Sequence, residues 1–166
     1  MPRPTQSPLT SPSLSSLTSL ELNTSPLTGD FYQWRIYQDG HPSPISLRIA
    51  PKPSSPIPKA SLGRTILTTQ QALRTYISGH YGATNDPLLP NDDPYKSSSQ
   101  LTGWFVGIDS FPKGNRHLTY GVVALVLQGL WDFLYKGGRY VEAAFEVQDD
   151  QWGSVGIGRV SREVPR

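Results

Sequence analysis

The sequence YGVVALVLQGLWDFLYK, residues 120–136, is the most apolar stretch of the chain and predicts a long helix. Val123, Leu127, Leu130 and Leu134 recur at three- and four-residue spacing and therefore fall on one face. Further apolar residues widen that face almost to the full circumference of the helix. A helix of this kind is buried, so we expect it to lie across a sheet.

The residues around this stretch predict where the helix begins and how closely it packs. Thr119 is a good N-cap, and the glycine pair at 137–138 ends the helix. Gly121 and Gly129 lie eight residues apart near one face. They would let the helix approach the sheet closely, because they add no side chain between the two layers.

The remaining elements are strands and one earlier helix. Five segments have the apolar or alternating pattern of strands: residues 31–37, 45–49, 101–109, 140–147 and 152–160. An apolar stripe at helical spacing predicts a helix at 62–78. The order ββαβαββ lacks the βαβα alternation of parallel sheets. It predicts an α+β fold, with a mostly antiparallel sheet of about five strands packed by two helices.

Four segments fall outside these elements. Residues 1–28 are rich in Ser, Thr and Pro and almost uncharged, which is typical of a disordered tail. We expect residues 29–166 to form a single α+β domain. Within it, the prolines of residues 51–58 predict a linker, with a loop at 38–44 between the first two strands. Residues 82–100 contain several turn formers and predict a long loop.

Composition narrows the classes of function. The chain has 166 residues and no cysteine, which excludes disulfides and thiolate chemistry. A formal charge of +2 with scattered Lys and Arg argues against nucleic acid as a partner. No apolar run is long enough for a transmembrane helix, and no signal peptide is recognisable. The cytoplasm is therefore the default compartment, with secretion as the alternative. We expect no metal site and no cofactor, and the oligomeric state stays open.

The glycine pair of Gly156-Ile157-Gly158 resembles part of a phosphate-binding turn. A dinucleotide fingerprint needs a third glycine and a following helix, and the sequence provides neither after Gly158. Alternating glycines in a strand instead let an aromatic ring or a helix pack closely against the sheet. We favour this packing interpretation.

Aromatic residues are the first candidates for a binding surface. Trp34, Trp104 and Trp152 lie in predicted strands and, exposed together, would form a face for a protein partner or a ring-bearing ligand. The alternative is that they belong to the core, as tryptophans in strands usually do.

Charged residues are the second group of candidates. Asp132 interrupts the apolar helix and would need a partner such as Arg139 or Lys136 if buried. The favoured alternative places Asp132 in a polar stripe with Gln128 and Lys136, four residues apart in each step.

Two further carboxylates share one face of a predicted strand. Glu142 and Glu146 lie beside Arg139 and near the returning Arg159. Such a pair can serve acid–base chemistry if the face lines a pocket. Solvated charges balanced across a hairpin are the commoner arrangement and the one we favour.

The C-terminal block resembles a pattern found in small uncharacterised proteins of filamentous ascomycete fungi. The resemblance covers about the last fifty residues. The segments that carry it are LTYG at 118–121, GLWDFL at 129–134, GRY at 138–140, FEV at 145–147 and GSVGIG at 153–158. It implies a lineage-restricted accessory protein rather than a central metabolic enzyme, and it brings no activity or functional residue with it.

Two hypotheses of function follow. The first is a non-catalytic accessory or interaction module that binds a protein partner through an aromatic sheet face. The second is a small-ligand-binding protein or an enzyme, with a pocket between the sheet and the helix at 120–136. In that second case Asp132, Arg139, Glu142 or Glu146 would reach into the pocket. We favour the first, and we assign no catalytic residue.

Overall fold

The computed structural model describes residues 30–80, 95–99, 102–113 and 117–163. The predicted tail at 1–28 lies outside these residues, as do 82–94 and 100 of the predicted loop. The elements in chain order are β1 (Tyr32–Gln38), β2 (His41–Pro56), α2 (Lys59–His80), β3 (Tyr95–Ser99), β4 (Trp104–Ser110), α3 (Tyr120–Leu130), a π-helical segment η2 (Trp131–Lys136), β5 (Val141–Asp149) and β6 (Gly153–Arg162).

The strands form a six-stranded sheet in the order β1-β2-β5-β6-β4-β3, and every neighbouring pair is antiparallel. Three hairpins build it: β1–β2, β3–β4 and β5–β6. The C-terminal hairpin lies in the middle, between β2 and β4. The α+β class, with an antiparallel sheet and two helices, is confirmed, and the sheet has one strand more than the five that the sequence predicted.

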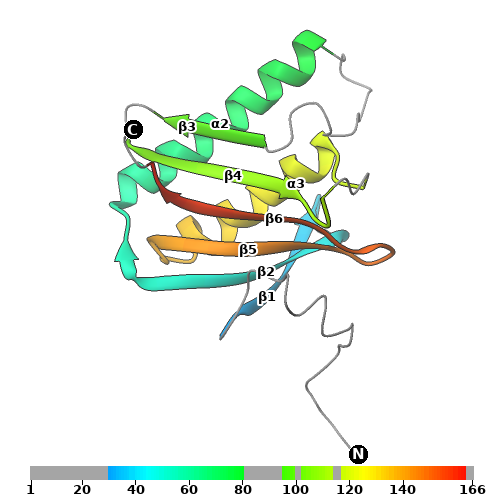
Figure 1. Ribbon diagram of the computed structural model, residues 1–166, viewed down its shortest axis with the longest axis horizontal. Coiled ribbons are helices and arrows are strands. Elements are labelled where there is room, and N and C mark those ends of the chain that lie inside the picture. The colour runs from blue at the N-terminus through cyan, green and yellow to red at the C-terminus, as the bar shows by residue number, and fades with distance from the viewer. Residues whose placement is uncertain (1–29, 81–94, 100–101, 114–116, 164–166) are drawn as a thin grey trace, which may run out of the picture.

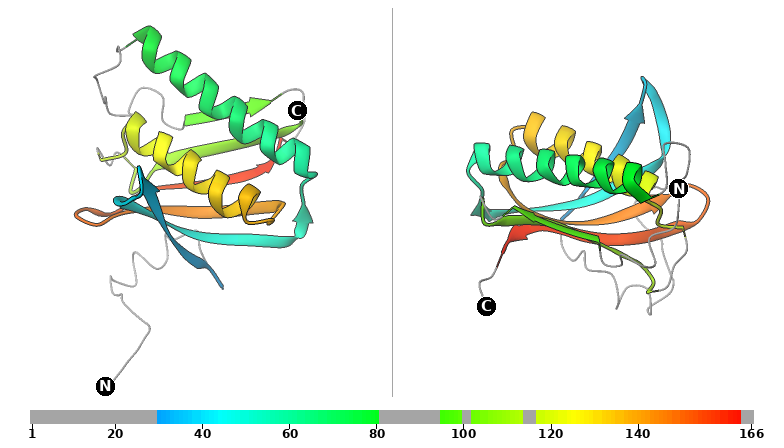
Figure 2. Two further views of the ribbon diagram at one scale, coloured as in Figure 1. Left: turned by 180° about the vertical axis from the view of Figure 1, so that it is seen from behind. Right: turned by 90° about the horizontal axis from the view of Figure 1, so that it is seen from above.

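Both helices lie on the same face of the sheet. Figure 1 looks at the face without helices, and the right view of Figure 2 shows α2 and α3 side by side on the other. Each helix connects one hairpin to the next, α2 from β2 to β3 and α3 from β4 to β5. One face of the sheet is therefore core, and within the described ranges no helix lies over the opposite face.

The packing of α3 against the sheet confirms the predicted core. Val123, Leu127 and Leu130 are fully buried. The predicted N-cap is also confirmed, because the Thr119 hydroxyl accepts a hydrogen bond of 3.2 Å from the Val122 amide. A Cβ placed on Gly129 would lie 2.9 Å from Ile36 of β1. The helix therefore meets the sheet through this glycine, as expected.

The predicted helix at 120–136 changes its winding at Trp131. Residues 131–136 form the π-helical segment η2, in which Phe133 and Leu134 are both buried. Phe133 lies 5.4 Å from Tyr32 and 5.3 Å from Trp34, measured between ring centroids. The end of this helix thus carries aromatic contacts to the edge strand β1.

The predicted loop at 82–100 is wrong in part, because Tyr95–Ser99 is strand β3. The segment YKSSS has no apolar alternation, so its side chains gave no strand signal. The strand is paired in register with β4 from Tyr95 opposite Ile108 to Ser99 opposite Trp104. Backbone pairing at the edge of a sheet places little demand on side-chain pattern.

The predicted linker at 51–58 is also wrong over most of its length, because β2 continues to Pro56. Pro51 lies opposite Ala143 of β5, and a bulge follows Lys52. The β1 partner of β2 ends with Tyr32 opposite Ile49. Beyond that point β2 pairs with β5 on one side, and among the described residues no strand pairs with it on the other side. Prolines are tolerated at such an edge because no ladder bond needs their missing N–H.

Element ends differ from the prediction at two further places. The expected loop at 38–44 is the short turn Asp39–Gly40, in which both residues have positive φ. This turn lets β2 begin at His41. The first helix spans 59–80 rather than 62–78, and it begins just after Pro58, which supplies the carbonyl that accepts from Leu62.

We predict that Gly129→Ala destabilises the protein by about 1–2 kcal/mol, because overpacking against Ile36 outweighs the gain in helix propensity. Gly79→Ala in α2 is the matched control, since a Cβ there meets nothing within 4 Å. It should leave stability unchanged or raise it by up to about 1 kcal/mol. Urea unfolding measures both, and equal stabilisation by the two variants would contradict the close helix–sheet contact.

Candidate binding surface

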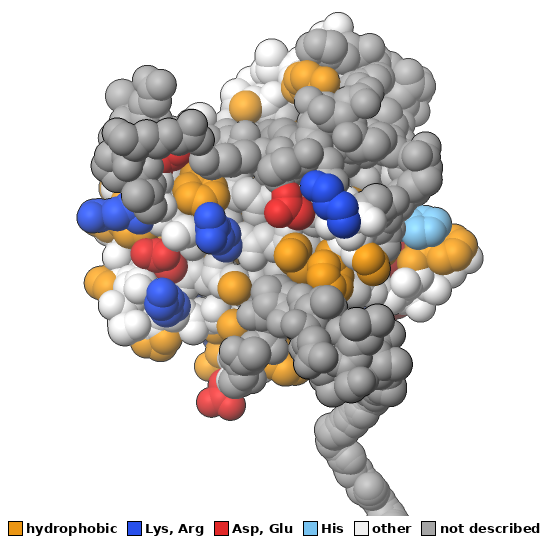
Figure 3. Space-filling model, viewed as in Figure 1, with side chains coloured by type: hydrophobic (Ala, Val, Ile, Leu, Met, Phe, Trp, Pro, Cys, Tyr) orange, Lys and Arg blue, Asp and Glu red, His pale blue; other side chains and the backbone are white. Residues whose placement is uncertain are grey.

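The face of the sheet opposite the helices carries a mixture of charged and apolar side chains. Figure 3 looks directly at this face and shows acidic and basic groups interspersed over the strands, with apolar patches between them. Because β-strand side chains alternate between the two faces, the antiparallel register defines which residues lie in rows across this surface.

One row on this face consists mainly of small residues. Ala50 of β2 lies opposite Ala144 of β5, which lies opposite Arg159 of β6. Arg159 in turn lies opposite Gly107 of β4. We call Ala50, Ala144 and Gly107 the small-residue row. Arg159 is the one long side chain that interrupts it.

Longer side chains stand on both sides of the small-residue row. One flanking row holds Lys52, Glu142, Ser161 and Phe105. The other flanking row holds Arg48, Glu146, Ile157 and Asp109. The two flanking rows are four residues apart along each strand, which corresponds to roughly 13 Å. From this pattern of side-chain sizes we infer a shallow trough across the strands, with the small-residue row as its floor and Arg159 standing within it.

The trough opens into a groove of about 1000 Å³ at the end of the sheet where β2 passes its bulge. Residues from the start of β1, from β2, β5 and β6, and from the segment after η2 line this groove. They are Asp30, Tyr32, Ala50, Pro51, Lys52, Pro53, Gly138, Arg139, Tyr140, Val141, Glu142, Ala143, Ala144, Arg159, Val160 and Ser161. The trough and the groove share Ala50, Ala144 and Arg159, so they form one continuous depression.

Arg139 forms one wall of the groove and also holds the end of η2. Its guanidinium donates a hydrogen bond of 3.0 Å to the Phe133 carbonyl oxygen. The same group lies 4.1 Å above the centroid of the Phe133 ring and 5.4 Å from that of Tyr32. A Cβ on Gly137 would collide with this guanidinium and with the Phe133 carbonyl. The arginine is therefore fixed in place by its own surroundings.

The two predicted strand carboxylates share the uncovered face, as expected, but each has its own partner. Glu142 accepts a hydrogen bond of 2.8 Å from the Ser161 hydroxyl. Glu146 is buried and accepts one of 3.1 Å from Arg48, whose guanidinium lies 4.1 Å from the Phe31 ring centroid. The structure thus places Glu142 in the groove with Arg139 and Arg159. Glu146 lies outside the groove and forms an ion pair with Arg48 instead.

The predicted tryptophans do not form one surface. Trp34 is half-buried on the helix side of β1, where it contacts Phe133. Trp104 is buried in the core, with the Arg162 guanidinium 5.1 Å from its ring centroid. Trp152 lies at the tip of the β5–β6 hairpin and is 51% exposed. The expected aromatic sheet face is therefore wrong, because alternation directs Trp34 and Trp104 to the helix side.

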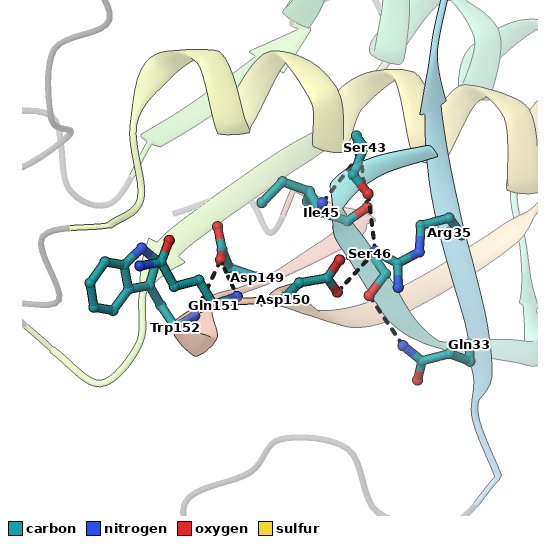
Figure 4. A network of polar contacts seen from close by, with 9 residues as sticks. All are labelled: Gln33, Arg35, Ser43, Ile45, Ser46, Asp149, Asp150, Gln151 and Trp152. Atoms are coloured by element: carbon teal, nitrogen blue, oxygen red, sulfur yellow. Dashed lines mark hydrogen bonds and ion pairs between the residues drawn. The ribbon is translucent and has the colours of Figure 1, made fainter. Parts of the chain in front are cut away.

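A polar network fixes the hairpin that carries Trp152 (Figure 4). The Asp149 carboxylate accepts hydrogen bonds of 2.8 and 3.2 Å from the Gln151 and Trp152 amides. Asp150 pairs with Arg35 at 2.9 Å. The Trp152 ring stacks on His117 with centroids 3.9 Å apart. The exposed ring is thus held on an ordered turn, far along the hairpin from the groove.

Asp132 lies in the polar stripe that the sequence favoured. It accepts a hydrogen bond of 3.1 Å from Gln128 and lies 3.6 Å from the Lys136 ammonium. The alternative partner Arg139 is wrong, because that guanidinium binds the Phe133 carbonyl. Asp132 is on the outer side of the helix and Glu142 is on the far side of the sheet. The candidate charges therefore do not converge between the sheet and the helix, where Leu127, Leu130 and Phe145 fill the space.

The glycines of β6 confirm the packing interpretation. A Cβ on Gly158 would collide with the Gly107 carbonyl oxygen and lie 2.5 Å from the Phe145 ring. A Cβ on Gly156 would lie 3.3 Å from Leu118. These glycines therefore make room for a core aromatic and for the chain before α3.

Sequence reasoning missed most residues of the depression, among them Ala50, Lys52 and Ser161. Lys52 lies between two prolines, and reading that segment as a linker hid its place in a strand. Ala50 lies within β2 and Ser161 lies near the end of β6; both are small residues, which carry no chemical signal alone. A search for small residues aligned across neighbouring strands would have needed the register.

No group of three or more histidines and carboxylates within the described ranges is placed to hold a metal ion. Within the same ranges, no helix is long and apolar enough to cross a membrane. No family model, curated protein or solved structure matches the chain.

We predict that Glu146→Ala lowers stability by about 1–3 kcal/mol, because Arg48 would lose a charged hydrogen-bond partner in a largely buried place. Asp132→Ala should change stability by no more than about 0.5 kcal/mol, since its pairing is of the exposed i, i+4 kind. Chemical denaturation of the two variants gives the comparison. A larger loss of stability for Asp132→Ala than for Glu146→Ala would contradict the buried position of Glu146 and the more exposed position of Asp132.

Proposed function

We propose that the protein is a non-catalytic binding module that receives an extended segment of a partner protein on the uncovered face of the sheet. The observation that carries the proposal is the groove of about 1000 Å³, which Ala50 and Ala144 of the small-residue row line. The row continues past Arg159 to Gly107 of β4, and this is the path of the inferred trough.

The dimensions of the trough suit one extended chain. The flanking rows are roughly 13 Å apart, and packed β layers lie about 10 Å apart, so a single backbone with its side chains fits between the rows. The chain would lie across the strands rather than add to their edge. A depression formed by several strands is also fixed in shape, which lowers the entropy cost of binding.

The polar groups of the depression support binding rather than a reaction. The Ser161 hydroxyl already donates to Glu142, and Arg139 already donates to the Phe133 carbonyl. These bonds hold the side chains as walls of the groove. Their roles are those of a recognition surface, in which positioned polar groups fix the orientation of a partner.

The proposal is tested by selecting binders from an unbiased library of twelve-residue peptides against the full chain. The selected peptides should bind at least tenfold more weakly to Ala144→Leu, because the larger side chain fills the trough floor. Ala72→Leu on the exposed surface of α2 is the matched control and should bind them unchanged. Fluorescence anisotropy measures the affinities. Selection of no peptide, or equal binding by Ala144→Leu, would contradict the proposal.

A further inference from the structure

The depression contains three cationic side chains that take part in none of the salt bridges formed among the described residues. Those salt bridges join Arg35 with Asp150, Arg48 with Glu146 and Lys136 with Asp132. The three cations of the depression are Lys52, Arg139 and Arg159. Among the described residues, the acidic side chains that line the same groove are those of Asp30 and Glu142. Positive charge is therefore in excess where the proposed segment would lie.

Arg159 is the central cation of this surface. It is exposed, and its guanidinium lies 5.4 Å from the Phe105 ring centroid. Contact with an aromatic face orients a guanidinium without using its N–H donors. The planar fork of an arginine matches the two oxygens of a carboxylate. Arg159 is thus oriented and still able to donate to an incoming anionic group.

From these features we infer that the segment accepted by the trough is acidic, with two carboxylates about three to four residues apart. The inference rests on the proposed function. Lys52 and Arg159 are two strands and one row apart, so their Cα atoms are roughly 12 Å from each other. An extended chain covers that distance in about three to four residues. One carboxylate would meet Arg159 and the other would meet Lys52.

Glu142 adds a restriction on the residues between the two carboxylates. It lies opposite Lys52 in register, and the hydrogen bond from Ser161 holds its carboxylate in the groove. A like charge beside it would be repelled. The segment therefore has uncharged residues between its two acidic ones, and a continuous acidic run binds more weakly.

The test uses the full chain and three synthetic twelve-residue peptides of glycine, serine and alanine. The first contains two glutamates four positions apart, the second has glutamines in their place, and the third has four contiguous glutamates. Fluorescence anisotropy at low and high salt measures binding. We expect the spaced acidic peptide to bind at least tenfold more tightly than the glutamine peptide, and severalfold more tightly than the contiguous one.

Protein variants show whether the named residues are responsible. Arg159→Gln and Lys52→Gln should each weaken binding of the spaced peptide at least fivefold. Arg74→Gln on α2 is an exposed control that should leave it unchanged. Glu142→Gln keeps an acceptor oxygen for Ser161 and removes the negative charge, so it should tighten binding severalfold. A gain of affinity cannot come from misfolding.

The outcomes separate this inference from the function on which it rests. If the glutamine peptide binds as tightly as the spaced acidic peptide, the acidic preference is overturned. If Ala144→Leu also abolishes that binding, the trough remains the binding site. Failure of the spaced peptide also overturns the inference, while the library selection decides the proposed function independently. Binding of a phosphoserine peptide or of anionic phosphatidylserine vesicles, without binding of the glutamate peptide, assigns the cations to phosphate and overturns it as well.

Discussion

The burial of α3 against the sheet is the contact on which the rest of the structure depends. This helix is apolar over most of its surface, and Gly129 lets it meet Ile36 and Leu47 with no intervening side chain. Its C-terminal turn brings Phe133 against the aromatic residues of β1. Since α2 packs beside α3 on the same face, the main hydrophobic core of the described residues lies between the helices and that face.

That position of the core has a functional consequence. The central strands β5 and β6 have apolar residues and glycines toward the helices, while their other face holds Glu142, Glu146 and Arg159. A face without helices, with a row of small residues and an excess of cations around it, is the kind of surface on which a partner segment can lie. The ion pair of Arg48 with Glu146 stabilises one border of that surface.

The sequence was sufficient for the parts of the fold that depend on apolar patterning. The helix at 120–136, its cap at Thr119 and the close packing at Gly129 and Gly158 follow from spacing and residue size. Strand β3 could not be predicted, because the sequence YKSSS has no apolar alternation. The Pro51–Pro56 part of β2 could not be predicted either, because only the register shows that those prolines lie beyond the last β1 pair.

The candidate site was less predictable than the fold. Glu142, Arg139 and Arg159 were expected near one another and do line one groove. The placement of the tryptophans could not be predicted, since the face to which each one points depends on which residues begin and end each strand. Lys52 and the small-residue row depend on alignment between strands that are far apart in the sequence.

The most direct test of the uncovered face as the binding surface is amide chemical-shift mapping of the full, ¹⁵N-labelled chain, titrated with the spaced acidic peptide. We expect the largest shifts on the strand residues around Ala50, Ala144 and Arg159, with little change in α2 and at the β5–β6 tip. Shifts concentrated on the helices or around Trp152 would contradict it.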